Sequence, residues 1–294
     1  MIGIALAAAS GVLLSFADAG KKHLTTAFSA EMLILLMFSF GIVTNLVYLN
    51  FHGVPSIAWE SVWLPALLCG LLAAVGELLF LYGLKGTDLS IAMPLMAFLP
   101  GFSSMLGYAL FDEIPSLLGG LGAVTIVAGA YLLNVKLPLR ENLLLPITQI
   151  LTNKACLFIL IAAFIGAILF VGQRYGVRHS SPVTFFTLTL VVDWFVFLGL
   201  VAWSGRFRIR QEVTAKLALT LSGTGFAWAI GLTCLYASYN YTLAVYAGSA
   251  MQIQTLLSIT LGTLLFREQR YVQRLTAGAV IVAGVIMISW AAKV

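Results

Sequence analysis

The chain has 294 residues, of which 61% are apolar and only 9% are charged. Soluble domains carry roughly 25% charged residues, so this composition excludes a soluble globular protein and predicts a membrane protein. The net charge of +5 does not indicate nucleic-acid binding, because the Lys and Arg residues lie between apolar blocks, where lipid head groups account for them.

The apolar residues form ten blocks, each close to the roughly 20 residues that a helix needs to cross a bilayer. The first block ends in Ala17-Asp18-Ala19, which resembles a signal-peptidase site. No basic residue precedes Lys21, however, so we expect this block to remain as a membrane helix. The predicted spans are 2–20, 32–49, 62–83, 90–110, 116–133, 155–173, 182–203, 218–240, 245–265 and 272–291.

An internal repeat relates the two halves of the chain. The segment TIVAGAYLL at 125–133 returns as VIVAGVIMI at 280–288, which is 155 positions later. The same shift superimposes several further pairs, namely Gly11 on Gly166, Glu113 on Glu268, and Gly129 on Gly284.

The repeat fixes the expected architecture. Each unit holds five spans, and because five is odd, the second unit enters the membrane from the opposite side. The sequence therefore predicts an all-α polytopic membrane protein with ten transmembrane helices, arranged as two inverted five-helix repeats. We place the repeats at 1–133 and 155–294, joined by a polar linker at 134–154.

The ends of the two units carry a family resemblance. LGYALFDEIPSLLGGLGAVTIVAGAYLL and LGTLLFREQRYVQRLTAGAVIVAGVIMI resemble the ends of the two EamA-type domains of the drug/metabolite transporter superfamily. The resemblance covers nearly the whole chain. It implies a ten-helix basket whose central cavity is lined mainly by the first, third and fourth spans of each half, with no obligatory cofactor. One departure is that Ser249 and Thr255 stand where the first half has Pro94 and Pro100.

Two acidic residues lie inside apolar spans. Glu77 is at least six residues from the nearest charged neighbour, and Asp193 lies near the middle of the seventh span. A carboxylate at membrane depth is costly to insert unless it faces a cavity or a partner, or is protonated. We expect Glu77 to contact substrate or exchange a proton. For Asp193 a proton site and an ion pair with a basic group such as Arg174 remain equally open. Asp18 and Glu31 are expected at span ends, where they reach water.

Aromatic and small polar residues form two further candidate faces. In the eighth span Trp228, Leu232 and Tyr236 follow each other at i+4 spacing, with Tyr239 beyond them. This aromatic face would oppose Glu77 and suits a ligand with a cationic group and an apolar body, although such stripes also serve plain helix packing.

The fourth and ninth spans supply the second face. Small or polar side chains recur every three residues in the ninth span, and the matching positions of the fourth span carry two prolines. Broken helices at matching positions point to a transporter site, although polar contacts between helices are an equal alternative for each side chain. The residues are Ser249, Gln252, Thr255, Pro94 and Pro100.

Catalytic and metal motifs do not occur in the sequence. There is no HExxH, P-loop or GxSxG pattern, and the three cysteines are widely spaced. We therefore predict no enzyme, no cofactor and no metal. The predicted function is secondary transport by alternating access, as an exporter of small metabolites such as amino acids or amines, with proton coupling left open. The alternatives are a sugar or nucleotide-sugar facilitator or importer, and a lipid-handling or assembly protein without an aqueous pathway.

Partners and location follow from the same reading. We expect a small-molecule substrate, the lipid bilayer of a bacterial-type inner membrane, no nucleic acid, and a monomer or homodimer. Connections after odd-numbered spans hold thirteen of the sixteen Lys and Arg residues. The positive-inside rule then places both termini outside, whereas the resemblance implies cytoplasmic termini, so the orientation remains open.

Overall fold

The computed structural model describes residues 2–99, 101–102, 105–106, 117–134, 151–204, 214–241, 247 and 250–291. Over these ranges the chain forms ten α-helices, which confirms the predicted all-helical fold. They are α1 (Ile2–Leu24), α2 (Ala30–His52), α3 (Trp59–Gly86), α4 (Leu89–Met96), α6 (Leu117–Asn134), α8 (Lys154–Arg178), α9 (Pro182–Ser204), α10 (Ala215–Ser238), α12 (Ile253–Phe266) and α13 (Tyr271–Ala291).

Five of these helices are long and apolar enough to cross a membrane, namely α1, α2, α3, α9 and α10. Shorter apolar stretches lie in α6, α8, α12 and α13. The first helix runs four residues past its predicted end at residue 20, to Leu24. Basic residues in a last turn favour the negative end of the helix dipole, which accounts for Lys21, Lys22 and His23 being helical.

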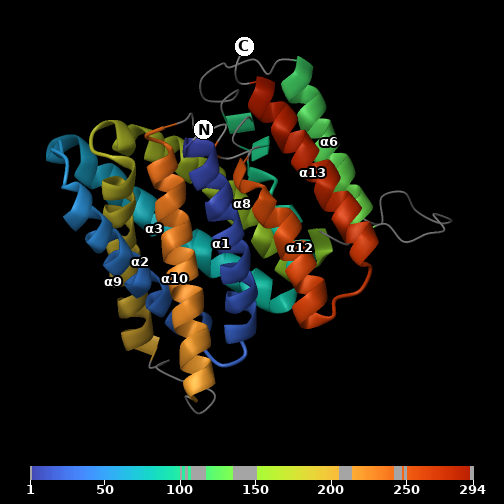
Figure 1. Ribbon diagram of the computed structural model, residues 1–294, viewed down its shortest axis with the longest axis horizontal. Coiled ribbons are helices and arrows are strands. Elements are labelled where there is room, and N and C mark those ends of the chain that lie inside the picture. Colours follow the sequence, from blue (N-terminus) through green and yellow to red (C-terminus); the bar gives the residue numbers. More distant parts are fainter. Residues whose placement is uncertain are drawn as a thin grey trace.

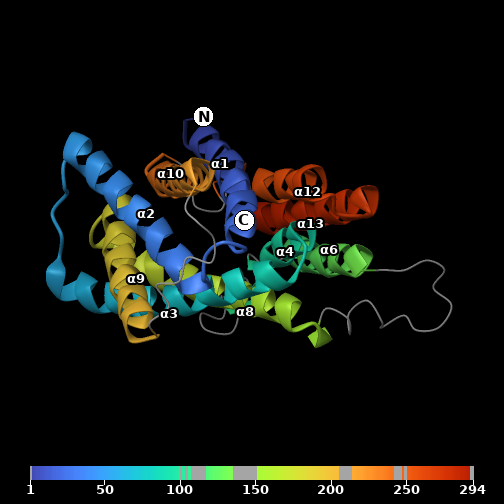
Figure 2. The same ribbon diagram turned by 90° about the horizontal axis from the view of Figure 1, so that it is seen from below.

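Helices of the two halves pack against each other in pairs that the 155-residue shift relates. The contact of α1 with α10 has its equivalent in α8 with α3, and the contact of α2 with α10 has its equivalent in α9 with α3. Two further pairs, α2 with α9 and α6 with α13, map onto themselves. In Figure 1 α1 and α10 stand side by side, and Figure 2 shows α2 and α9 at one edge with α6 and α13 at the other. The halves are thus interleaved around a common core.

The repeated glycines explain the repeated apolar segment. A methyl group built on Gly129 would lie 2.9 Å from the backbone nitrogen of Ile281 and 3.0 Å from the carbonyl oxygen of Ala277. A methyl group on Gly284 would lie 2.9 Å from the nitrogen of Ile126 and 2.7 Å from the oxygen of Gly122. The two sets of contacts are equivalent under the shift, so each glycine lets the backbones of α6 and α13 approach closely.

Enlarging either glycine should separate these two helices. We expect Gly129→Leu and Gly284→Leu each to lower the free energy of unfolding by about 1–3 kcal/mol, because the new side chain meets backbone that cannot move aside. Thermal unfolding of purified protein in detergent measures the effect. Gly199→Leu is the matched control, since a methyl group on Gly199 meets nothing within 4 Å. Equal melting temperatures for all three variants would contradict the tight packing of α6 on α13.

Helical order is interrupted at matching positions in the fourth helix of each half. In the first half α4 ends at Met96 and Ala97 lies in a turn, while in the second half Gln252 lies in a turn directly before α12. Ala97 and Gln252 are equivalent under the shift. The turns carry tight backbone bonds, from Phe98 N to Leu95 O at 3.2 Å and from Thr255 N to Gln252 O at 3.0 Å.

A glycine of the opposite half lies against each break. A methyl group on Gly11 of α1 would lie 2.6 Å from the carbonyl oxygen of Met251 and 3.2 Å from the nitrogen of Gln254. A methyl group on Gly166 of α8 would lie 2.7 Å from Cδ1 of Leu99. Leu99 and Gln254 are equivalent under the shift, as are the two glycines. The first helix of each half therefore packs closely on the broken helix of the other.

Candidate functional site

Glu77 forms a buried ion pair with a lysine from the first helix. Lys21 Nζ lies 2.8 Å from Glu77 Oε1, and the two side chains are 4% and 24% exposed. Glu77 stands nine residues before the end of α3 at Gly86, which is about 13 Å along the helix axis at 1.5 Å per residue. The ammonium of Lys21 is thus held within the apolar part of the protein by a carboxylate of α3.

The same ammonium lies against two aromatic rings. It is 5.4 Å from the ring centroid of Phe80 and 5.3 Å from that of Trp228. Phe80 is on α3, whereas Trp228 is on α10 of the second half and is 5% exposed. The predicted neighbourhood of Trp228 and Glu77 therefore exists, and Lys21 occupies the place between them where a cationic group was expected. Rings at this distance attract a desolvated cation by up to about 2 kcal/mol.

Asp18 lies one turn before Lys21 on α1 and faces the break in α12. Its Oδ2 accepts a hydrogen bond of 2.6 Å from Nε2 of Gln254, and Asp18 is 3% exposed. The prediction that Asp18 and Glu31 reach water is wrong. Glu31 is also buried, and its Oε1 accepts from the hydroxyl of Tyr82 at 2.8 Å. Glu31 lies in the first turn of α2, whereas Asp18 lies inside α1, which continues to Leu24, so a position near the end of a predicted span does not bring either acid to the surface.

Asp193 is buried on α9 and its Oδ1 has no hydrogen-bond partner among the described residues. The carboxylate of Glu77 acts electrostatically on that of Asp193. The side chain of Arg174, which was one proposed partner, lies outside the described side chains. Together Asp18, Lys21, Glu77 and Asp193 form what we call the buried charge cluster.

The tyrosines of the aromatic face contact other helices than α3. The hydroxyl of Tyr236 donates to Oε1 of Gln173 on α8 at 3.1 Å, and its ring stacks on Phe186 of α9 with centroids 4.3 Å apart. Tyr239 is half-buried and meets Tyr236 edge to face, with centroids 5.7 Å apart. The structure therefore joins Trp228 to Lys21 and Glu77, and joins Tyr236 to α8 and α9, with Tyr239 packed on Tyr236.

The polar face of the ninth span is inside the protein. Gln252 and Thr255 are buried, and the Thr255 hydroxyl donates to Oε1 of Gln252 at 3.1 Å. Pro94 is buried within α4. Ser249 and Pro100, which complete the predicted set, lie outside the described residues.

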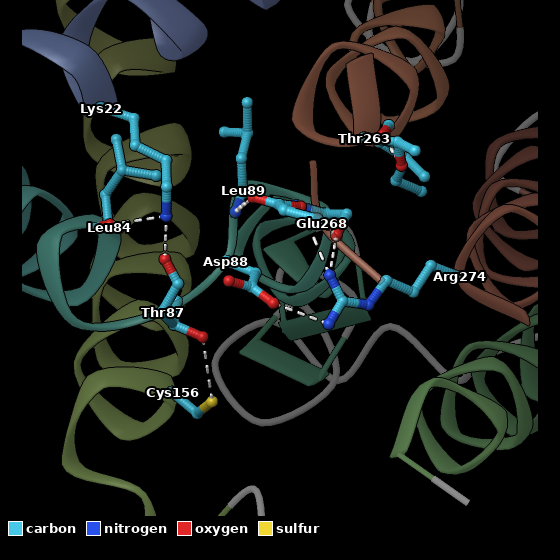
Figure 3. Close-up of polar contacts among 11 residues, drawn as sticks. Lys22, Leu84, Thr87, Asp88, Leu89, Cys156, Thr263, Glu268 and Arg274 are labelled. Carbon is cyan, nitrogen blue, oxygen red and sulfur yellow. Dashed lines mark hydrogen bonds and ion pairs between the residues drawn. The ribbon is translucent and has the colours of Figure 1, made fainter. Parts of the chain in front are cut away.

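A second polar cluster joins the two halves at the end of the molecule where α3 ends and α4 begins (Figure 3). Glu268, just before α13, accepts from the backbone nitrogens of Leu89 at 2.8 Å and Ser90 at 3.0 Å, and also from the Ser90 hydroxyl. Arg274 Nη1 lies 3.3 Å from Glu268 Oε2, and its Nη2 lies 2.7 Å from Asp88 Oδ2. We call Asp88, Ser90, Glu268 and Arg274 the face cluster.

The face cluster changes the interpretation of Glu268. Glu268 stands three residues before α13, so its position in the chain alone associates it with the start of that helix. In the structure its carboxylate binds the first two amides of α4, which belongs to the other half, so it satisfies a helix N-terminus there. Its repeat mate Glu113 lies outside the described residues.

Lys22 belongs to the same end of the molecule as the face cluster. Its Nζ donates to the carbonyl oxygens of Leu84 at 3.5 Å and of Thr87, which ties the end of α1 to the end of α3. Lys21, Lys22 and Arg274 were counted among the loop charges that set the orientation. All three lie in helices and make specific contacts, so the positive charge free to act on the membrane is smaller than the sequence suggested.

Sequence reasoning missed Lys21, Asp18 and Gln254 as members of one group. The basic pair after the first span looked like a membrane-flanking signal, and only the i,i+3 spacing of Asp18 and Lys21 inside an apolar helix indicated a shared face. Gln254 offered no signal, because its partner lies 236 positions away.

Comparison with known proteins agrees with this architecture. The EamA-like transporter family matches residues 1–135 and again 153–290. A solved structure, titled only as the crystal structure of a protein, is similar with a TM-score of 0.60 at 16% identity, over 97% of this chain and 94% of that chain. This likeness concerns the fold alone. A search of curated proteins finds no significant match. With ten helices over the described residues, interleaved repeated halves and two family matches that together span most of its length, the chain belongs to the EamA-like transporter family.

Proposed function

We propose that the protein is a secondary transporter that exports a small metabolite carrying an amino group, and that the buried charge cluster contacts that group. The charge balance of the cluster carries this proposal. The cluster holds three carboxyl groups, those of Asp18, Glu77 and Asp193, against one ammonium, that of Lys21, which pairs with Glu77 and acts on Asp18. The charged group that acts on Asp193 is the Glu77 carboxylate. A buried carboxylate without a partner costs at least about 2.5 kcal/mol at membrane depth, so a proton or a cationic group must balance the excess.

The surroundings of the cluster suit such a ligand. Phe80 and Trp228 already accommodate the ammonium of Lys21, so the same rings can accept the cationic end of an amine or amino acid while an apolar body packs on Trp228. Gln252 and Thr255 would supply hydrogen bonds from the broken helix. Proton exchange at Glu77 or Asp193 would couple the export to the proton gradient.

The repeated halves supply a route for alternating access. We infer that the halves, 1–133 and 155–294 with the linker 134–154, are inverted in the membrane, and that they rock against each other about the cluster. Breaks in α4 and α12 at equivalent positions would allow part of each helix to move with either half. The bacterial-type inner membrane, and a monomer or homodimer, are part of the same proposal.

A sugar or nucleotide-sugar facilitator is supported by one observation, since Lys21 is a basic residue inside the protein. Anionic substrates need positive charge in excess, however, and here the carboxyl groups outnumber the ammonium. Lys22 does not alter this balance, because its ammonium binds carbonyl oxygens at the end of α3. The amine-type substrate is therefore favoured by the charge of the site.

The experiment combines a ligand screen with transport in proteoliposomes. Purified protein would be heated with amino acids, amines, sugars and nucleotide sugars, and the compounds that raise the melting temperature would then be loaded into proteoliposomes. We expect efflux of an amino-group compound that depends on pH, and we expect Glu77→Gln to abolish that pH dependence. Glu60→Gln is the matched control, since Glu60 is exposed in the first turn of the same helix.

The outcomes separate the parts of the proposal. Unchanged pH-dependent efflux by Glu77→Gln would remove Glu77 from the mechanism. Stabilisation and transport of sugars or nucleotide sugars, with no response to amino compounds, would replace the amine exporter by the facilitator. If the wild-type protein exports an amino compound at the same rate across the pH range, the transport function stands and the proton coupling is ruled out.

A further inference from the structure

Asp18 joins the first helix of one half to the broken helix of the other half. Its Oδ2 accepts a bond of 2.6 Å from Gln254, the second residue of α12 after the turn at Gln252. The carboxyl group is 3% exposed, so water does not compete for this bond. A carboxylate that accepts from a neutral amide in such a place makes a charge-assisted hydrogen bond, which is about twice as strong as a neutral one.

Helix α1 contacts the start of α12 at two positions along the axis of α1. Gly11, two turns before Asp18 on the same face of α1, packs against the backbone of Met251 and Gln254. The backbone contact and the side-chain bond from Asp18 therefore both hold the start of α12 to α1. This arrangement exists in one half only, because the repeat mates of Asp18 and Gln254 are Gln173 and Leu99, which cannot ionise.

The ionisable groups that act on Asp18 come from two helices. Lys21 lies one turn along α1 and Glu77 lies on α3, and both act electrostatically on the Asp18 carboxyl. From α12 the contact is the neutral amide of Gln254, and from α10 Trp228 lies over Lys21. Lys21 is itself bound to Glu77, so part of its charge is already engaged.

We propose that Asp18 is a proton-controlled positioning residue, whose ionised carboxylate holds α12 to α1 through Gln254 and whose protonation releases the break. The inference rests on the proposed transport function, in which Asp18 would convert the uptake of a proton into movement of the broken helix. When Asp18 gains a proton, its bond with Gln254 loses the assistance of the negative charge. The start of α12 is then held to α1 by the glycine contact and a weaker, neutral hydrogen bond.

Amide hydrogen exchange tests this switch with protons as the only ligand. Exchange at residues 250–257 would be followed by mass spectrometry in protein reconstituted in nanodiscs, with the chemical exchange rate at each pH divided out. We expect opening of this segment to be about fivefold more frequent at low pH than at high pH, which corresponds to the loss of charge assistance from one hydrogen bond. Residues of α6, a helix that carries no member of the buried charge cluster, provide the internal reference.

Three variants distinguish the switch from its neighbours. Asp18→Asn keeps an acceptor but cannot ionise, so the pH step should disappear. Gln254→Leu removes the donor, so the segment should open often at every pH. Glu60→Gln should keep the full step. The exchange experiment contains no substrate, so it tests the switch separately from the proposed function. A wild-type protein whose exchange does not change with pH would overturn the switch but not the amine transporter. A substrate screen without any amino-group ligand would overturn the amine transporter but not the switch.

Two further results would also overturn the proposal. One is a pH step that persists in Asp18→Asn. The other is a step that vanishes in Glu77→Gln while it survives in Asp18→Asn, since the proton would then act at Glu77. If Asp18→Asn does not fold, Gln254→Leu is the deciding variant. A pH step in hydrogen exchange that persists in Gln254→Leu would show that the step does not depend on the bond between Asp18 and Gln254, and it would overturn the proposal.

Discussion

Replacing Lys21 with methionine should destabilise the protein more than any other single change in the buried charge cluster. Methionine keeps an unbranched, slightly shorter side chain but removes the ammonium, so Glu77 loses its partner at 2.8 Å and Asp18 loses the cation one turn along α1. Breaking a buried pair by removing one partner costs about 3–5 kcal/mol, because an uncompensated charge remains. We expect this loss in the apparent free energy of unfolding, measured in detergent or bicelles at neutral pH.

A charge-matched variant separates the missing charge from the missing packing. In Lys21→Met with Glu77→Gln the unpaired carboxylate is gone, so we expect most of the lost stability to return. Lys85→Met is the control, since Lys85 is an exposed lysine near the end of α3. If the double variant were as unstable as Lys21→Met alone, the cost would come from packing against Phe80 and Trp228, and the charge argument for the cluster would fail.

Replacing Glu268 with alanine should have a comparable effect at the face cluster. The carboxylate satisfies the amides of Leu89 and Ser90 and pairs with Arg274, all of them buried. Alanine would leave the start of α4 uncapped, and the guanidinium of Arg274 would keep only the Ser90 hydroxyl and the half-exposed Asp88 carboxylate as partners among the described residues. The expected loss is again about 3–5 kcal/mol, for the same reason as at Lys21. Thermal or denaturant unfolding of the purified variant measures it.

Asp88→Asn removes a more exposed carboxylate of the same cluster, so its effect on stability can be compared with that of Glu268→Ala. Asp88 binds the same guanidinium at 2.7 Å, but its side chain is 45% exposed. Exposed ion pairs contribute about 1 kcal/mol or less, so this variant should stay close to wild type. Equal losses for Asp88→Asn and Glu268→Ala would show that burial does not set the strength of these contacts. Loss of stability in neither would mean that the face cluster does not hold α4 to α13.

The sequence alone determined the class of the protein and its repeated build. Long apolar blocks can be read without knowing their neighbours, because each helix satisfies its own backbone hydrogen bonds in the bilayer. The internal repeat, at a shift of 155 residues, pairs Gly129 with Gly284 and Gly11 with Gly166. In the structure the two members of each pair make equivalent packing contacts. Glu77 was also identified from its isolation in an apolar span, since an acid there must have a partner or a proton.

Only the tertiary structure decided which partners these groups meet. Lys21 and Lys22 are adjacent and look alike in the sequence, yet one lies between Glu77 and Trp228 while the other binds carbonyl oxygens at the end of α3. The spacing along the chain cannot separate them, because 100° of rotation around α1 sends neighbouring side chains toward different helices. Likewise Asp18 meets Gln254, and Glu268 meets the start of α4, across 236 and 179 positions. Such contacts depend on how the two halves interleave, and local residue patterns do not encode that arrangement.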